Sequence, residues 1–196
     1  MTTIHNCLLD QSNDRLVDGR TVGERISTAG YRCLWSERTK PVDTIVIHYI
    51  SAVERIPDTP FDFDAILQIF CDYAVSSHYC ITRQGAAFRL VNETDKAWHC
   101  GKSIMPWPDM REGVNDFSIG IELVATENSG FTDAQYATVI ALCSDIEKRY
   151  SRCFNILGHE HVAGERAVRM GLRDDKKSDP GPLFKWGDLY TNLALK

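Results

Sequence analysis

The chain has 196 residues, of which 43% are hydrophobic and 25% are charged, and its formal net charge is −5. This composition is typical of a globular protein and excludes a collagen-like, low-complexity or disordered chain. The acidic balance and the lack of a long basic run argue against nucleic acid as the main partner, because phosphate binding depends on clustered Lys and Arg side chains.

The length favours a single domain over residues 1–196. Residues 1–42 are mixed and turn-rich, and we expect them to wrap the surface of a core that begins at residue 43. The first clear element is residues 43–50, a short β-branched run that predicts a buried strand with His48 near its end. A polar side chain at the end of a buried strand is well placed for a functional site.

The next two patterns predict a helix and a hairpin. Apolar residues recur at helical spacing over 61–73, and Asp62 and Asp64 suit the first turn of a helix there. The runs 77–82 and 86–91 flank a turn that contains glycine, which is typical of a β-hairpin.

Residues 117–124 predict a second central strand. Ser118, Gly120 and Glu122 fall on one face by the two-residue period of a strand, and apolar side chains fall on the other. An acidic side chain in so apolar a strand is costly unless something pairs with it, so Glu122 is a candidate functional residue.

The clearest helix is predicted at 133–150, with Thr132 and Gln135 in a capping box. Residues 155–159 then predict a short strand that ends at His159, followed by a polar loop up to Asp179. Strands mixed with helices in this order predict an α/β fold with a mixed central β-sheet flanked by helices.

Two features bear on the compartment. The chain starts without a basic stretch followed by an apolar one, and no run reaches the ~18 apolar residues of a membrane helix, so we expect a cytoplasmic protein with no membrane partner. The seven cysteines are odd in number and no pair is spaced C-x-x-C, which favours reduced thiols over a disulfide framework or a zinc ribbon.

The common catalytic motifs are missing. The chain has no phosphate-binding glycine loop and no G-x-S-x-G motif. His159 and Glu160 begin an H-E-x-x-H pattern, but position 163 is alanine, so a zincin helix is excluded. His161 completes only an H-x-H, which a strand or loop could turn toward a metal.

A scattered set of residues remains. Two histidines and a carboxylate, which His48, His159 and Asp179 could supply, are a common ligand set for catalytic zinc. A carboxylate such as Glu122 can shuttle protons beside the metal, and an ammonium such as that of Lys177 can stabilise an oxyanion. These parts suffice for amide hydrolysis. The plainer alternative is that the histidines are polar caps at strand ends.

Six segments occur in an order that resembles the N-acetylmuramoyl-L-alanine amidases of the AmpD type, a family related to peptidoglycan-recognition proteins and to phage amidase lysins. The resemblance covers about residues 43–186, and its most specific segments are 115–123 and 177–182. The six segments are residues 44–48, 76–79, 97–101, 115–123, 158–159 and 177–182.

The resemblance implies a Zn²⁺ site at strand ends, a catalytic pair and a substrate groove. The implied residues are His48, His159 and Asp179 for zinc, Glu122 and Lys177 for catalysis, and Trp98 and His99 for the groove.

Alternatives remain at several of these positions. His161 could replace His159 as a ligand, and Lys176 could stand in for Lys177. Two aromatic residues are also open: Trp98 could be plain core, and Trp107 could be a groove wall or part of an exposed loop. We expect His78 to be structural and leave it out of the site.

The sequence departs from the family pattern in two places. The stretch between His159 and Lys177 is longer than is typical of cytosolic AmpD-type enzymes, so a loop at residues 162–173 could cover the zinc or shape the groove. The basic residue that often precedes Asn115 is not clearly matched, since Arg111 lies slightly upstream. Selectivity for the anhydro sugar is therefore open.

The resemblance implies a zinc amidase that cleaves the bond between N-acetylmuramic acid and L-alanine. With no secretory signal expected, the favoured substrate is a soluble 1,6-anhydro-muropeptide in cell-wall recycling, and a monomer is expected. The alternatives are a phage lysin or exported effector that digests polymeric peptidoglycan, and a protein that binds muropeptides without cutting them.

Overall fold

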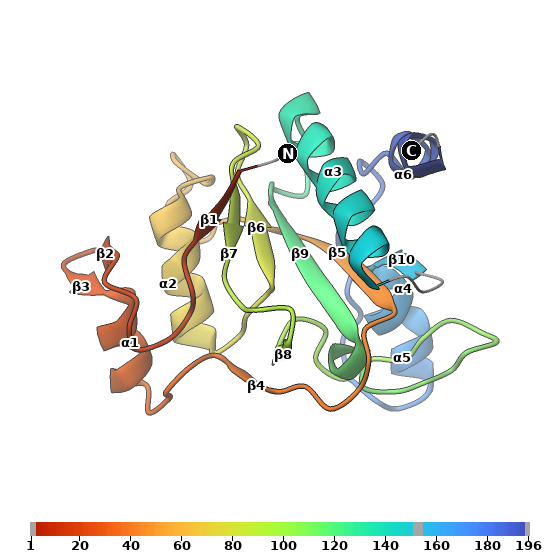
Figure 1. The fold of residues 1–196 in the computed structure, drawn as a ribbon, viewed down its shortest axis with the longest axis horizontal. Helices are drawn as coiled ribbons and strands as arrows, with labels where there is room; N and C mark the ends of the chain where they lie inside the picture. Colours follow the sequence, from red (N-terminus) through yellow and green to blue (C-terminus); the bar gives the residue numbers. More distant parts are fainter. Residues whose placement is uncertain (1–2, 151–154, 195–196) are drawn as a thin grey trace.

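The computed structural model describes residues 3–150 and 155–194, and its centre is a mixed six-stranded β-sheet (Figure 1). The strand order is β1-β7-β6-β9-β5-β10. Strands β6 and β7 pair antiparallel, and the other neighbours in this sheet pair parallel. The strands are β1 (Ile4–Asn6), β5 (Thr44–Ile50), β6 (Tyr79–Ile81), β7 (Ala87–Arg89), β9 (Ser118–Val124) and β10 (Asn155–Gly158).

Two small ribbons and several helices surround this sheet. The ribbons are antiparallel pairs: β2 (Leu16–Val17) with β3 (Arg20–Thr21), and β4 (Trp35–Glu37) with β8 (Asp95–Ala97). The helices are α1 (Val22–Thr28), α2 (Phe63–Tyr73), the 3-10 helix η1 (Val114–Phe117), α3 (Asp133–Tyr150), α4 (His159–Ala163), α5 (Glu165–Arg169) and α6 (Trp186–Ala194). No helix of the described residues combines the length and the apolarity that crossing a membrane requires.

The two faces of the sheet are covered by different helices, α1 and α2 on one side and α3 and α6 on the other (Figure 1). Successive side chains of a strand point to opposite faces. Ile47 of β5 and Ile121 of β9 accordingly pack in the core beneath α3. Their neighbours His48 and Glu122 therefore point to the opposite face, where the candidate site lies.

The fold class predicted from the sequence is confirmed, and so are its main elements. Strands β5 and β9 and the hairpin β6–β7 form where they were expected, and α2 starts at Phe63 with Asp62 as its N-cap. The capping box of α3 is present: Gln135 donates its backbone N–H to Thr132 Oγ1 at 3.1 Å, and Thr132 donates its own to Gln135 Oε1 at 3.0 Å.

Two expectations were wrong. The stretch after β10, expected to be a loop, folds into α4 and α5 in its first half. The first 42 residues do more than wrap the surface, because β1 extends the central sheet beside β7 and β4 pairs with β8. The six described cysteines are free, as expected, and Cys153 lies outside the described residues.

Candidate metal and catalytic site

Two histidines meet because their strands are neighbours. Strands β5 and β10 run parallel, with Gly158 opposite Ile47, so the residues that follow in each strand lie side by side. These residues are His48, which β5 carries, and His159, the first residue of α4. Their ring centroids are 4.5 Å apart, and both residues are buried.

Asp179 comes to the same point from a distant segment. Its Oδ2 lies 3.1 Å from His48 Nδ1, and its Oδ1 lies 3.1 Å from His159 Nδ1. A side chain at Gly158 would prevent this approach, because a Cβ there would lie 2.6 Å from Cδ of Pro180. Glu160 also donates its backbone N–H to the Asp179 carbonyl at 2.9 Å, which holds the segment against α4.

The protonation of these groups suits a cation. His159 Nε2 lies 3.2 Å from the Cys100 carbonyl oxygen, which can only accept a hydrogen bond. A neutral His159 therefore carries its proton on Nε2. Its lone pair is then on Nδ1, which faces Asp179. Burial raises the pKa of Asp179, but the adjacent imidazoles of His159 and His48 outweigh it and hold that pKa below its usual range. Burial, followed by the electrostatic effect of the neighbouring His159, lowers the pKa of His48 to about 4, so His48 is neutral at pH 7.

This donor set fits zinc. One ligand atom from each of His48, His159 and Asp179 lies within 4.8 Å of the other two, and two neutral imidazoles with a carboxylate are donors that Zn²⁺ accepts. The structure thus brings together the three residues that the sequence suggested as ligands.

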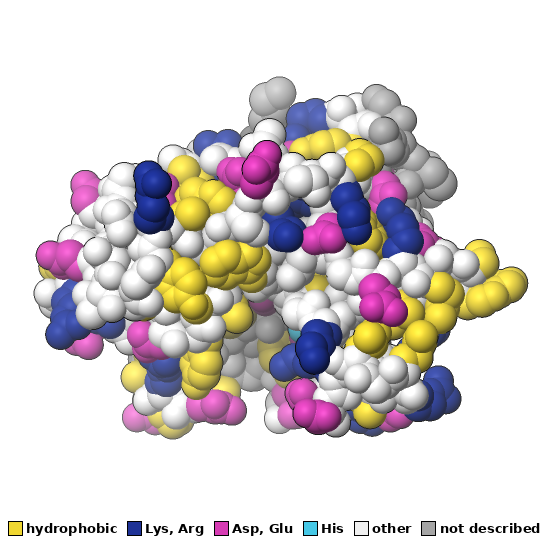
Figure 2. Space-filling view, turned by 90° about the horizontal axis from the view of Figure 1, so that it is seen from below, with side chains coloured by type: hydrophobic (Ala, Val, Ile, Leu, Met, Phe, Trp, Pro, Cys, Tyr) yellow, Lys and Arg dark blue, Asp and Glu magenta, His cyan; other side chains and the backbone are white. Residues whose placement is uncertain are grey.

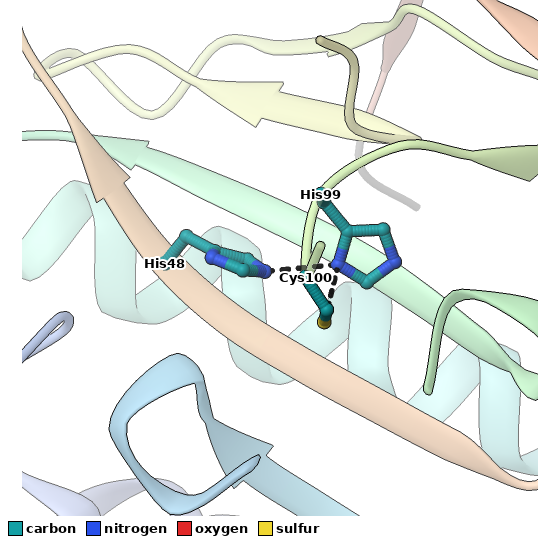
Figure 3. Close-up of side chains that lie close together, drawn as sticks. All are labelled: His48, His99 and Cys100. Carbon is teal, nitrogen blue, oxygen red and sulfur yellow. Dashed lines mark hydrogen bonds between the residues drawn. The ribbon is translucent and has the colours of Figure 1, made fainter. Parts of the chain in front are cut away.

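A second group of potential ligands shares His48 and consists of His48, His99 and Cys100 (Figure 3). Cys100 Sγ lies 3.2 Å and His48 Nε2 lies 3.0 Å from His99 Nδ1. Zinc binds the thiolate form of cysteine, whereas burial raises the pKa of Cys100 well above its usual range. The His48–His159–Asp179 group is therefore the better fit.

Glu122 lies beside the histidines, since it is the register partner of His48 across β5 and β9. Its side chain is buried, and its Oε2 has no hydrogen-bond partner among the described residues. Burial, followed by the charge of Asp179, raises the pKa of Glu122 well above its usual range. A buried carboxylate oxygen without a partner is costly, so Glu122 remains a candidate functional residue.

A cavity of about 380 Å³ opens over these groups, and both candidate lysines line it. Lys176 forms an ion pair with Glu165 at 2.7 Å, while the one ion pair of Lys177 among the described residues is a 3.9 Å contact with Asp175. Lys177 therefore has the freer ammonium group. Figure 2 shows a hollow in this face with a histidine at its base and basic side chains beside it.

The two groove candidates differ in placement. Trp98 is half-buried, donates its indole N–H to Ser36 Oγ at 3.2 Å and lines an adjoining cavity of about 350 Å³. His99 lines both cavities, but its ring packs flat on Gly120, where a Cβ would lie 2.6 Å from Cγ of His99. The nitrogens of His99 point toward His48 and Ser118 rather than into open space.

The other candidate residues lie outside the group formed by His48, His159, Asp179 and Glu122. His161 uses its Nδ1 to accept the backbone N–H of Gly158 at 2.8 Å, and it belongs to neither group of potential metal ligands. Trp107 is 79% exposed. Arg111, which lies slightly upstream of Asn115, forms ion pairs with Asp43 and Asp109.

His78 is fully buried and accepts the backbone N–H of Gly120 at 2.9 Å, as a structural residue would. Sequence reasoning missed Cys100 and Ser118, which contact His159 and His99. The only sequence signal for Cys100 is its place next to His99, and for Ser118 its place on the same strand face as Glu122.

Known amidases are similar to this chain in sequence. The sequence model of the family described as N-acetylmuramoyl-L-alanine amidase (Amidase_2) matches residues 38–182. The 1,6-anhydro-N-acetylmuramyl-L-alanine amidase AmpD of Enterobacter cloacae is 38% identical over 122 residues, which are 62% of this chain and 58% of the relative. AmpD of Haemophilus influenzae is 33% identical over 78% of this chain and 84% of its own length. The chain thus spans less than two thirds of the length of the E. cloacae relative.

Solved structures of amidases share the fold of this chain. A crystal structure of AmpD as its selenomethionine derivative aligns with a TM-score of 0.64 and 30% identity, over 81% of this chain and 89% of that chain. Escherichia coli AmiD, in complex with anhydro-N-acetylmuramic acid-L-Ala-D-γ-Glu-L-Lys, aligns with a TM-score of 0.61 and 31% identity, over 77% of this chain and 57% of that chain. The sequence match, the shared fold and the resemblance of the ordered segments lead to one conclusion: the chain belongs to the N-acetylmuramoyl-L-alanine amidase family.

Proposed function

We propose that the protein is a zinc-dependent amidase that hydrolyses the bond between 1,6-anhydro-N-acetylmuramic acid and L-alanine of a peptide stem. The observation that carries this proposal is the convergence of His48, His159 and Asp179 beside the unpartnered carboxylate of Glu122. The names of the relatives, which act on or bind anhydromuramyl peptides, support this substrate class.

In this proposal His48, His159 and Asp179 hold the metal. Zn²⁺, when bound, would polarise the amide carbonyl and make the attacking water more acidic. Glu122 accepts the proton of that water on its free Oε2 and then gives it to the nitrogen of the departing L-alanine. Lys177 places its ammonium group near the carbonyl oxygen, where negative charge develops.

The two adjoining cavities give room for the two sides of the amide. Glu122, His159 and Lys177 line both of them, so a substrate that fills both would carry its scissile bond past these residues. Trp98 borders one cavity and offers an apolar face to the sugar or the peptide. We further propose that the chain works as one domain and as a monomer in the cytoplasm, where anhydro-muropeptides would be recycled.

The test is incubation of the zinc-loaded protein with anhydromuramoyl-tripeptide and analysis of the products by mass spectrometry. We expect free tripeptide and anhydro-N-acetylmuramic acid in equal amounts. Intact substrate would contradict the proposal, and tight binding of uncut substrate would identify a muropeptide-binding protein instead. Purified sacculi are the second substrate: faster release of peptides from sacculi than from the soluble fragment would favour a lysin or exported effector.

A further inference from the structure

A chain of hydrogen bonds leads from the backbone of η1 to His48. Ser118 Oγ lies 2.7 Å from the Val114 carbonyl oxygen, and two oxygens this close must share the hydroxyl proton. A hydroxyl has one proton, so Ser118 Oγ can only accept from its other neighbour, His99 Nε2 at 3.2 Å. The proton in that contact therefore belongs to His99.

The next link follows from the single N–H of a neutral imidazole. With its proton on Nε2, His99 has its lone pair on Nδ1, which lies 3.0 Å from His48 Nε2 (Figure 3). His48 must then donate from Nε2, and its own lone pair is left on Nδ1. That Nδ1 lies 3.1 Å from Asp179 Oδ2, on the side of the His48–His159–Asp179 group.

The ring of His99 is held in one orientation, so its tautomer can determine the tautomer of His48. Its flat face rests on the bare Cα of Gly120, and Asn115 Oδ1 accepts the backbone N–H groups of His99 at 3.3 Å and of Cys100 at 2.8 Å. Cys100 Sγ, at 3.2 Å from His99 Nδ1, can add only a weak S–H donor to the same lone pair.

We propose that Ser118 and His99 are positioning residues that fix the tautomer of His48 and leave only its Nδ1 free for a metal. They thereby direct the cation to the His48–His159–Asp179 group and away from the His48–His99–Cys100 group, which would need the lone pair on Nε2 instead. This inference rests on the proposed zinc site, and it replaces the expected role of His99 in the substrate groove.

The first test reads the tautomer in the metal-free protein. Long-range ¹H–¹⁵N correlation spectra of protein labelled with ¹⁵N-histidine distinguish the two tautomers of a ring, and the signals of His48 are identified by their loss in His48→Asn. We expect His48 protonated on Nε2 alone. Protonation on Nδ1, or an even mixture of tautomers, would overturn the proposal.

The second test uses two variants of similar chemistry. In His99→Asn the amide oxygen can take the place of Nδ1 and accept from His48, whereas in His99→Gln the amide reaches the place of Nε2 and leaves His48 without an acceptor. We expect the dissociation constant for Zn²⁺, measured by competition with a chromophoric chelator, to rise about 10- to 100-fold in His99→Gln. In His99→Asn it should rise much less; equal effects would contradict a positioning role.

Two further variants distinguish a positioning role of His99 from direct binding of the metal by His99 and Cys100. Ser118→Ala keeps His99 but removes its acceptor, and we expect a mixture of His48 tautomers and weaker Zn²⁺ binding in this variant. It therefore tests the proposal even if the His99 variants do not fold. Cys100→Ala keeps the backbone carbonyl and should bind Zn²⁺ as tightly as the native chain; a large loss would show that the metal uses the His48–His99–Cys100 group. If the native chain bound no zinc, the proposed function would fail. The tautomer measurement on the metal-free protein would still show whether Ser118 and His99 fix the tautomer of His48.

Discussion

Replacing Glu122 by glutamine should lower kcat for anhydromuramoyl-peptide hydrolysis by about 10²- to 10⁴-fold, the usual contribution of a general acid–base group. This equals about 3 to 5 kcal/mol of transition-state stabilisation. Glutamine has the size of glutamate but cannot accept the proton of the attacking water. The measurement is steady-state kinetics on the soluble substrate, with zinc content determined for each preparation.

The same variant should keep its fold and its metal. Glu122 is buried and its Oε2 has no hydrogen-bond partner among the described residues, so an uncharged side chain removes a desolvation cost. We therefore expect the free energy of unfolding of Glu122→Gln, measured in urea on metal-free protein, to equal or exceed that of the native chain. Retained kcat in a folded, zinc-loaded variant would remove Glu122 from the mechanism.

Replacing Asp179 by alanine should weaken zinc binding by more than about 100-fold, since losing a supporting residue alone costs 10- to 100-fold. Asp179 supplies the one negative charge of the His48–His159–Asp179 group, and both histidine Nδ1 atoms lie about 3.1 Å from its carboxylate. Activity at sub-saturating zinc should fall in parallel. Chelator competition gives the affinity, and activity is measured across a zinc titration.

The matched control for this variant is Asp175→Ala. Asp175 lies four residues earlier on the same segment, its side chain is 73% exposed, and its ion pairs with Lys177 and Arg173 are long. Exposed pairs of this kind contribute little, so zinc affinity should stay within about threefold of the native value. Similar losses in both variants would mean that the segment, rather than the Asp179 carboxylate, governs metal binding.

The sequence predicts the long elements well because their hydrophobic periods extend over many residues. Strands β5 and β9 and helix α3 lie within one residue of their expected ends. The short elements carry no such signal. Helices α4 and α5 have five residues each, and tertiary hydrogen bonds tie α4 in place, from Ile104 N–H to the Val162 carbonyl and from Lys177 N–H to the Ala163 carbonyl.

The N-terminal strand was missed for a related reason. The three residues of β1 are exposed, so they show no alternation of buried and exposed side chains, and only their pairing with β7 makes them a strand. A sequence pattern detects burial on one face, and an exposed edge strand of three residues has none to detect.

The candidate site, too, can be predicted from the sequence only in part. Residue types, their places in the strands and the family resemblance are enough to suggest His48, His159, Asp179 and Glu122. The role of His99 is different, because it depends on which nitrogen carries a proton, and this follows from contacts with Ser118 and His48 that only folding creates. The choice between Lys176 and Lys177 likewise needs the ion pair with Glu165.

We propose that three side chains remote in sequence hold one divalent cation, and an anomalous difference map of crystals grown with zinc would locate that ion. With data collected on both sides of the zinc absorption edge, we expect a single peak per chain, bounded by His48 Nδ1, His159 Nδ1 and the Asp179 carboxylate. A peak between His48 Nε2, His99 and Cys100, or no peak at either position in zinc-saturated crystals, would rule out the His48–His159–Asp179 site.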